Sequence, residues 1–200
     1  MTDMDFNTAD TQDSAFALIP ANTLAKVCLT IRPGGAGPEG WLTQSRSSSA
    51  LYLNSEAVIA DGPNARRRIY TRIGFRGRNA GTGAEDTYAN RGRALLRGIL
   101  ESAHGVRSDD TSEQARAKRS IRSFGDMSGL TFIAKIGIER DKNDPNDQGR
   151  NVIAAAIGPQ HPEYAALMGT APAAYAAAPA TAPATSPNTS PNGNAPFWAQ

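Results

Sequence analysis

Hydrophobic and polar residues alternate along five segments of the chain, and a period of two is typical of strands that bury one face of a sheet. In the third segment, Ile69 and Ile73 fall on one side. Arg68, Tyr70 and Arg72 fall on the other side. We therefore expect this strand to have an apolar face and a face of arginine and tyrosine. The five predicted strands cover residues 24–32, 49–60, 67–75, 130–139 and 150–157.

A different spacing predicts helices. Between residues 88 and 104, apolar residues recur every three or four positions, as on one face of a helix. Asp86 or Thr87 is suited to cap its start, and Gly105 is placed to end it. A shorter helical segment with several arginines is predicted for residues 112–123.

The predicted elements follow the order of three strands, one long helix and two strands. The five-stranded oligonucleotide-binding (OB) barrel uses this order, with a helix between strands three and four. The alternation slips in the second strand, and a bulge near Ser55 would account for the slip and help the strand curl. We therefore expect an all-β fold with one or two helices, namely a five-stranded OB-like barrel within residues 15–164.

Composition separates two tails from this domain. Residues 1–14 are polar and acidic, and residues 165–200 consist largely of Ala, Pro, Thr, Ser and Asn. Such segments bury too little apolar surface to offset the entropy lost on ordering, so we expect both to be disordered. The second tail ends in Pro196, Phe197 and Trp198 before the last two residues. Paired aromatics commonly anchor one protein to another, so we expect these three residues to bind a partner. The alternative is that the two aromatic side chains fold back onto the surface of the barrel itself.

The charges are distributed unevenly, although the net charge is only +2. Between Arg66 and Arg122 the chain carries 14 Arg or Lys residues against 6 Asp or Glu residues. The first 20 residues carry acids and no Arg or Lys. A basic segment of this kind attracts an acidic partner such as nucleic acid.

Arginines and aromatic residues on and around the third strand are the candidate binding site. Guanidinium groups pair with phosphates and aromatic rings stack on unpaired bases, which together suit a single strand of nucleic acid. The alternative is an ordinary solvated strand face, because the chain uses 17 Arg against 4 Lys throughout. The candidate residues are Arg67, Arg68, Tyr70, Arg72, Arg76, Arg78, Trp41, Tyr52, Lys142 and Arg150.

Catalysis and metal binding find little support in the sequence. Cys28 is the single cysteine, so one chain can form neither an internal disulfide nor a thiolate metal cluster. His104 and His161 lack the partners of a nucleophilic triad and the spacing of a metal site. The aspartate-rich loop at 141–149 departs from the calcium-loop pattern, because Pro145 stands at its fifth position. We expect no enzymatic activity, no cofactor and no metal.

Hydropathy bears on where the protein acts. No apolar run approaches the roughly 18 residues that a membrane-spanning helix needs. The acidic first residues also lack the basic and apolar regions of a signal peptide. We expect a cytoplasmic protein without a membrane partner.

Five short segments stand out, at residues 18–23, 61–67, 92–100, 124–130 and 151–153. Together they resemble a family of phage- and prophage-encoded single-stranded-DNA-binding proteins. The resemblance covers roughly residues 16–160 and implies a barrel that coats single strands during phage replication or recombination. The tail is similar to that of bacterial single-strand-binding proteins, which ends in a partner-binding peptide with Pro-Phe. Here the preceding acidic residues are absent and three residues follow Phe197.

These observations predict a single-stranded-DNA-binding protein of phage-type replication or recombination. The expected partners are single-stranded DNA, replication or recombination proteins at the tail, and a second copy of the chain. An alternative is a structural or adaptor protein of a phage particle or replication complex, in which the barrel makes protein contacts. A third interpretation is a nuclease accessory or an enzyme with an unrecognised metal site.

Overall fold

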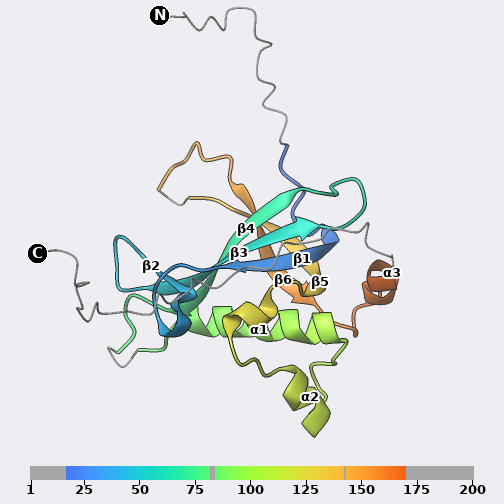
Figure 1. Ribbon diagram of the computed structural model, residues 1–200. Helices are drawn as coiled ribbons and strands as arrows, with labels where there is room; N and C mark the ends of the chain where they lie inside the picture. The colour runs from blue at the N-terminus through green and yellow to red at the C-terminus, as the bar shows by residue number, and fades with distance from the viewer. Residues whose placement is uncertain (1–16, 82–83, 142, 170–200) are drawn as a thin grey trace, which may run out of the picture.

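The computed structural model describes residues 17–81, 84–141 and 143–169, and the tail residues Pro196, Phe197 and Trp198 lie outside them, as do residues 1–14. Figure 1 shows one strongly twisted sheet with a long helix packed along one side. The strands are β1 (Leu24–Arg32), β2 (Leu42–Gln44), β3 (Leu51–Ile59), β4 (Arg68–Arg76), β5 (Thr131–Glu139) and β6 (Arg150–Ile157). The helices are α1 (Thr87–His104), α2 (Glu113–Lys118) and α3 (Tyr164–Gly169), with 3-10 turns at η1 (Pro38–Gly40) and η2 (Phe124–Met127).

The sheet is antiparallel throughout. β1 lies in the middle, where it pairs with β3 on one side and β5 on the other. β4 continues the sheet beyond β3, and β6 continues it beyond β5. These five strands are the five predicted from the alternation. The sixth strand, β2, was not predicted, since it is only three residues long and pairs with the start of β3.

The edges of β4 and β6 face each other, yet they do not close a barrel. The backbone N–H of Ile153 donates to Oγ1 of Thr71 at 2.8 Å, so a side chain supplies the acceptor that a neighbouring strand would provide. Within the described residues, no backbone ladder joins β4 to β6. The predicted order of long strands and helix is confirmed, but the fold is mixed α/β rather than all-β, with a six-stranded antiparallel sheet and the long helix between β4 and β5.

The hydrophobic core lies between the inner face of the sheet and α1. Val27, Leu29 and Ile31 alternate along β1 and are completely buried. Ile99 and Leu100 of α1 pack into the same cluster. Burial of this apolar surface is the main term that stabilises the fold.

The long helix begins and ends where its capping residues predict. The Asp86 side chain accepts a hydrogen bond from the N–H of Ala89, and Gly105 adopts a left-handed φ of 64° after the last turn. α1 packs very closely on β4, because a Cβ at position 92 would lie 1.7 Å from the carbonyl oxygen of Gly74. Only glycine at position 92 permits this approach.

The irregularity of β3 lies elsewhere than predicted. The register against β4 shifts between Leu51 and Tyr52, rather than near Ser55. Val58 and Ile59 are both buried although they lie on opposite faces of β3, which explains the apparent slip in the hydrophobic pattern.

The folded part extends a little beyond the predicted boundary at residue 164. Tyr164 starts α3 and donates its hydroxyl to the carbonyl of Ser102. The Nζ of Lys26 donates to the carbonyl of Met168 near the end of the same helix. None of the helices in the described residues is both long and apolar enough to cross a membrane.

Candidate nucleic-acid interface

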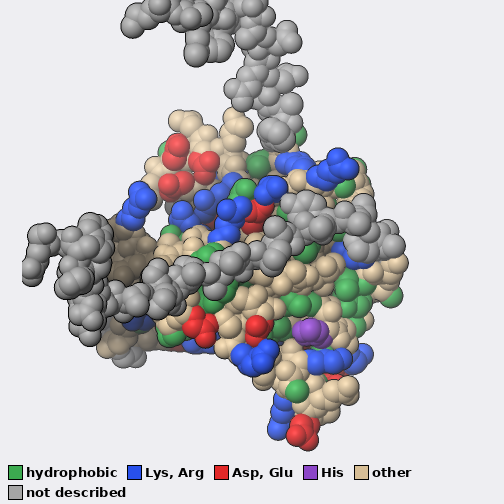
Figure 2. All heavy atoms as spheres, in the orientation of Figure 1, with side chains coloured by type: hydrophobic (Ala, Val, Ile, Leu, Met, Phe, Trp, Pro, Cys, Tyr) green, Lys and Arg blue, Asp and Glu red, His purple; other side chains and the backbone are tan. Residues whose placement is uncertain are grey.

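The face of β1, β3 and β4 that points away from the core, here called the outer face, carries four of the ten candidate residues, namely Tyr52, Arg68, Tyr70 and Arg72. Arg68, Tyr70 and Arg72 are exposed on β4 while Ile69 and Ile73 are buried, so the predicted alternation is confirmed. Figure 2 shows Lys and Arg side chains gathered over β3 and β4.

The strand register arranges the outer face in rows of three side chains. Arg32, Asn54 and Arg72 form one row across β1, β3 and β4. Glu56 occupies the centre of the next row and lies directly opposite Tyr70. Arg32, Asn54 and Glu56 were not predicted as site residues, because only the pairing of the strands brings them beside β4.

Tyr70 is the most exposed of the large apolar side chains at this site. Its side chain is 54% exposed, and the guanidinium carbon of Arg32 lies 6.0 Å from its ring centroid. This distance is within the range of a cation–π interaction. The ring is therefore held beside a positive charge while much of it still contacts solvent.

A second arginine–tyrosine pair lies nearby. The guanidinium carbon of Arg72 lies 5.3 Å from the ring centroid of Tyr52. Tyr52 pairs across the strands with Gly74, and a Cβ at position 74 would lie 2.8 Å from the ring of Tyr88. Burial raises the pKa of the Tyr88 hydroxyl, and the positive charge of Arg72 acts in the opposite direction. Tyr88 thus joins the site from the first turn of α1.

Two hollows meet on this surface. The first has a volume of about 510 Å³ and the second a volume of about 580 Å³. Arg72 and Arg150 line both hollows, so the two adjoin, and together they are here called the groove. The first hollow is lined by Arg32, Pro33, Asn54, Ser55, Tyr70, Thr71, Arg72 and Arg150. The second is lined by Arg72, Glu139, Arg140, Asp141, Asn143, Asp147, Gly149 and Arg150.

The loop between β5 and β6 forms the far wall of the groove. Its acidic side chains bond to the loop's own backbone, since Asp147 accepts from the N–H groups of Asp141 and Gly149. These two hydrogen bonds hold the pKa of Asp147 below its usual value. Arg150 forms an exposed ion pair with Glu139 at the base of the loop. Lys142, predicted in this loop, lies outside the described residues.

Three other predicted arginines lie at or just beyond the two ends of β4. Arg67 precedes β4 and donates to the carbonyl of Ala17 at 2.8 Å. Arg76 donates to the carbonyl of Ser49, and the exposed Arg78 follows in the next loop. None of these three arginines lines either of the two hollows.

Trp41 does not belong to the interface. Its side chain is 7% exposed and packs in the core, where a Cβ at Gly125 would lie 2.6 Å from the indole. The sequence predicts Trp41 as a residue that could stack on a base, but β2 starts at the next residue and the indole lies in the core. Its ring is therefore not available to stack on a base.

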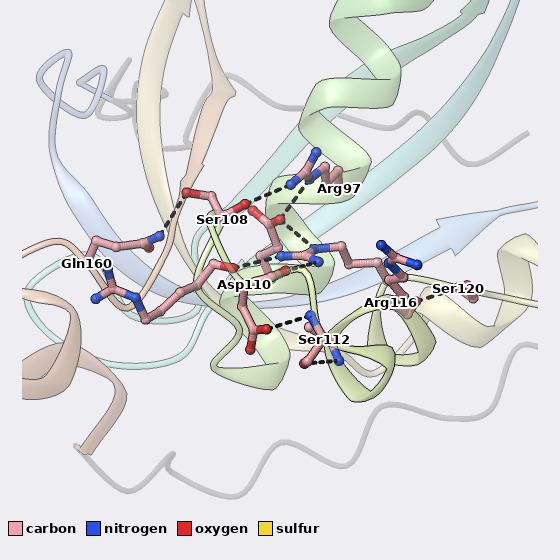
Figure 3. Close-up of polar contacts among 11 residues, drawn as sticks. Arg97, Ser108, Asp110, Ser112, Arg116, Ser120 and Gln160 are labelled. Carbon is pink, nitrogen blue, oxygen red and sulfur yellow. Dashed lines mark hydrogen bonds and ion pairs between the residues drawn. The ribbon is translucent and has the colours of Figure 1, made fainter.

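A separate polar cluster on α1 and the following loop is shown in Figure 3. Glu101 accepts hydrogen bonds from Arg97 and Arg119, both at 2.7 Å. Arg119 also donates to the carbonyls of Asp110 and Arg107. These bonds fix the segment that contains α2 to the main helix, so the arginine Arg119 serves the fold.

Comparison with known proteins adds no relative. No protein-family model matches the chain, and no curated protein matches its sequence. The arginine and tyrosine side chains of the outer face are therefore the main indication of function.

Proposed function

We propose that this protein binds single-stranded DNA along the outer face of a partly open OB-like barrel, in which the Thr71 side chain links the facing edges of β4 and β6 in place of a backbone ladder. The observation that carries the proposal is the pair of arginine–tyrosine contacts beside one groove, Arg32 with Tyr70 and Arg72 with Tyr52. Arginine pairs with phosphate, and a tyrosine ring stacks on an unpaired base.

The order of the elements supports the barrel part of this proposal. Leaving out the three-residue β2, three long strands, a helix and two long strands follow one another as in OB folds. β1 pairs with the second and the fourth of these five long strands, β3 and β5. In such folds the loop between the last two strands contacts the ligand. Here the loop between β5 and β6 lines the groove.

The role that fits this surface is binding without catalysis. This role and the resemblance to phage-type single-strand-binding proteins together favour a cytoplasmic protein of replication or recombination. A partner protein would bind the tail at Pro196, Phe197 and Trp198, and a second copy of the chain could bind the same strand.

Binding to oligonucleotides tests the proposal. Fluorescence anisotropy is measured with labelled single-stranded DNA, duplex DNA and single-stranded RNA over a series of salt concentrations. We expect single-stranded DNA to bind more tightly than duplex, because stacking needs unpaired bases, and affinity to fall steeply with salt. Equal affinity for duplex, or no binding at low salt, would contradict the proposal and favour an adaptor role.

Arg72→Ala locates the binding on the outer face. The plot of log affinity against log salt should become shallower by roughly 0.7, the change expected for one lost phosphate contact on a single strand. Arg116→Ala is the matched control, because Arg116 is exposed on α2 away from the groove. It should leave the slope unchanged.

A further inference from the structure

We propose that Glu56 is a positioning residue, whose buried carboxylate holds Arg32 and Arg68 in the orientation that binds DNA. The inference rests on the proposed function. It gives a role to an acidic residue at the centre of the face that is proposed to bind DNA phosphates.

Glu56 lies in the middle of the outer face. Its side chain is only 5% exposed, and it lies opposite Thr30 of β1 and Tyr70 of β4. Arg32 donates from Nε to Oε2 of Glu56 at 2.8 Å and from Nη2 to the same oxygen. Arg68 donates from Nη1 to Oε1. Each carboxylate oxygen therefore holds one arginine, one from either neighbouring strand.

The two arginines stay accessible although they are paired. The side chains of Arg32 and Arg68 are 54% and 48% exposed. Two guanidinium groups and one carboxylate leave a net positive charge, so a phosphate is still attracted to the row. Because Glu56 is buried beneath them, an incoming phosphate reaches the arginines before the acid.

Holding the arginines in the free protein favours binding. A long side chain that is already fixed loses less conformational entropy when it contacts a ligand. Arg32 is also the cation beside Tyr70, so the Glu56 contact keeps it against the ring that we expect to stack on a base.

The cluster around Glu101 shows the contrasting case. It also joins one acid to two arginines, but the side chain of Arg119 is only 13% exposed and its other donors bond to backbone carbonyls. A ligand therefore has little access to the guanidinium group of Arg119. The other arginine of that cluster, Arg97, is 55% exposed, so the Glu101 cluster offers a ligand one exposed arginine, whereas both arginines of the Glu56 cluster are about half exposed.

The inference is tested by whether one substitution raises or lowers the affinity for single-stranded DNA. Glu56→Gln removes a negative charge from the face, so simple electrostatics predicts tighter binding of single-stranded DNA. Positioning predicts the opposite, with binding weaker by about three- to tenfold and a salt slope shallower by roughly 0.7 as one phosphate contact is lost. Glu113→Gln is the matched control, because it makes the same charge change at an exposed acid on α2 that lines neither hollow. It should bind as tightly as the natural chain or more tightly.

Glu56→Asp separates geometry from charge. It keeps the carboxylate but shortens its reach, so it should also weaken binding and flatten the salt slope. NMR of the Arg32 Nε–H gives a readout without DNA, because this hydrogen is protected from exchange only while it is bonded to Glu56. Melting curves confirm that each variant is folded.

The outcomes separate this inference from the proposed function. If the natural chain binds single strands but Glu56→Gln and Glu56→Asp bind as well or more tightly, positioning is wrong and the proposed function stands. If the natural chain does not bind, the proposed function fails and the role of Glu56 toward DNA fails with it. An unprotected Arg32 Nε–H in the natural chain would also overturn the inference.

Discussion

Arginine residues of this protein take different roles according to the acceptors around them. Arg119 contacts one buried carboxylate and two backbone carbonyls, and these contacts use its donors within the fold. Arg72 lies over the ring of Tyr52 in an open groove, where its charge faces solvent. The surroundings of each guanidinium group, rather than the number of arginines, therefore indicate where DNA would bind.

Two glycines of α1 should respond to alanine in opposite ways. Gly92→Ala should lower the free energy of unfolding by about 1 to 3 kcal/mol, because the new Cβ meets the carbonyl of Gly74 and forces α1 away from β4. Gly98→Ala should raise it by up to about 1 kcal/mol, since a Cβ there lies at an ordinary 3.5 Å from Ala156 and alanine favours the helix. Chemical denaturation measures both, and equal effects would contradict the close packing at Gly92.

Residues of the candidate nucleic-acid interface differ in how well the sequence predicts their positions. The outward direction of Arg68, Tyr70 and Arg72 follows from local alternation on one strand, and the structure confirms it. The position of Glu56 depends on the register between β3 and β4, which no local pattern contains. Tyr88 reaches the outer face only because α1 packs against Gly74, so its place depends on tertiary contacts as well.

At the scale of elements, Asp86 connects the loop after β4 to the start of α1. One carboxylate oxygen accepts from the N–H of Ala89 at 3.0 Å, and the other accepts from Gly77 at 2.7 Å. These backbone hydrogen bonds, first that from Gly77, lower the pKa of Asp86 below its ordinary value of 3.8. The sequence predicts the cap, but the bond to Gly77 appears only in the folded loop.

The Asp86 carboxylate should make stability depend on pH in the acidic range. A lowered pKa means that its stabilising effect is present above the unfolded value of 3.8 and is lost as pH falls through the folded-state pKa. Asp86→Ala should therefore lower the melting temperature at neutral pH, and this difference should shrink in acid below that value. Thermal unfolding followed by circular dichroism measures it. Asp86→Asn keeps an acceptor and should lose less, and a difference independent of pH would contradict the role of the charge.

At the scale of the whole molecule, the order of strands and helix follows from the sequence, but the relation between the sheet edges does not. Hydrophobic periodicity predicts the five long strands and α1, because each pattern is local. Whether β4 and β6 form a ladder depends on how far the twisted sheet curls. Here Thr71 on β4 reaches Ile153 on β6 with its side chain.

Replacing Thr71 tests the connection between the two edges. Thr71→Val keeps the shape but leaves the buried N–H of Ile153 without its acceptor, which should cost about 1 to 3 kcal/mol of unfolding free energy. Hydrogen exchange at the Ile153 amide should become faster in the same variant. Thr71→Ser retains the hydroxyl and should protect that amide as in the natural chain. Unchanged exchange in Thr71→Val would show that the hydroxyl does not hold the edges together.

The facing edges of β4 and β6 also affect how copies of the protein behave when they are crowded together. Unpaired strand edges exposed to solvent recruit strands from other molecules and begin aggregation. Here the Thr71 contact keeps two edges of the same chain turned toward each other. A strand from a neighbouring molecule therefore has little access to that seam, although no backbone ladder closes it in the described part of the chain. Copies bound side by side on one strand, as in the proposed function, would keep their sheets separate.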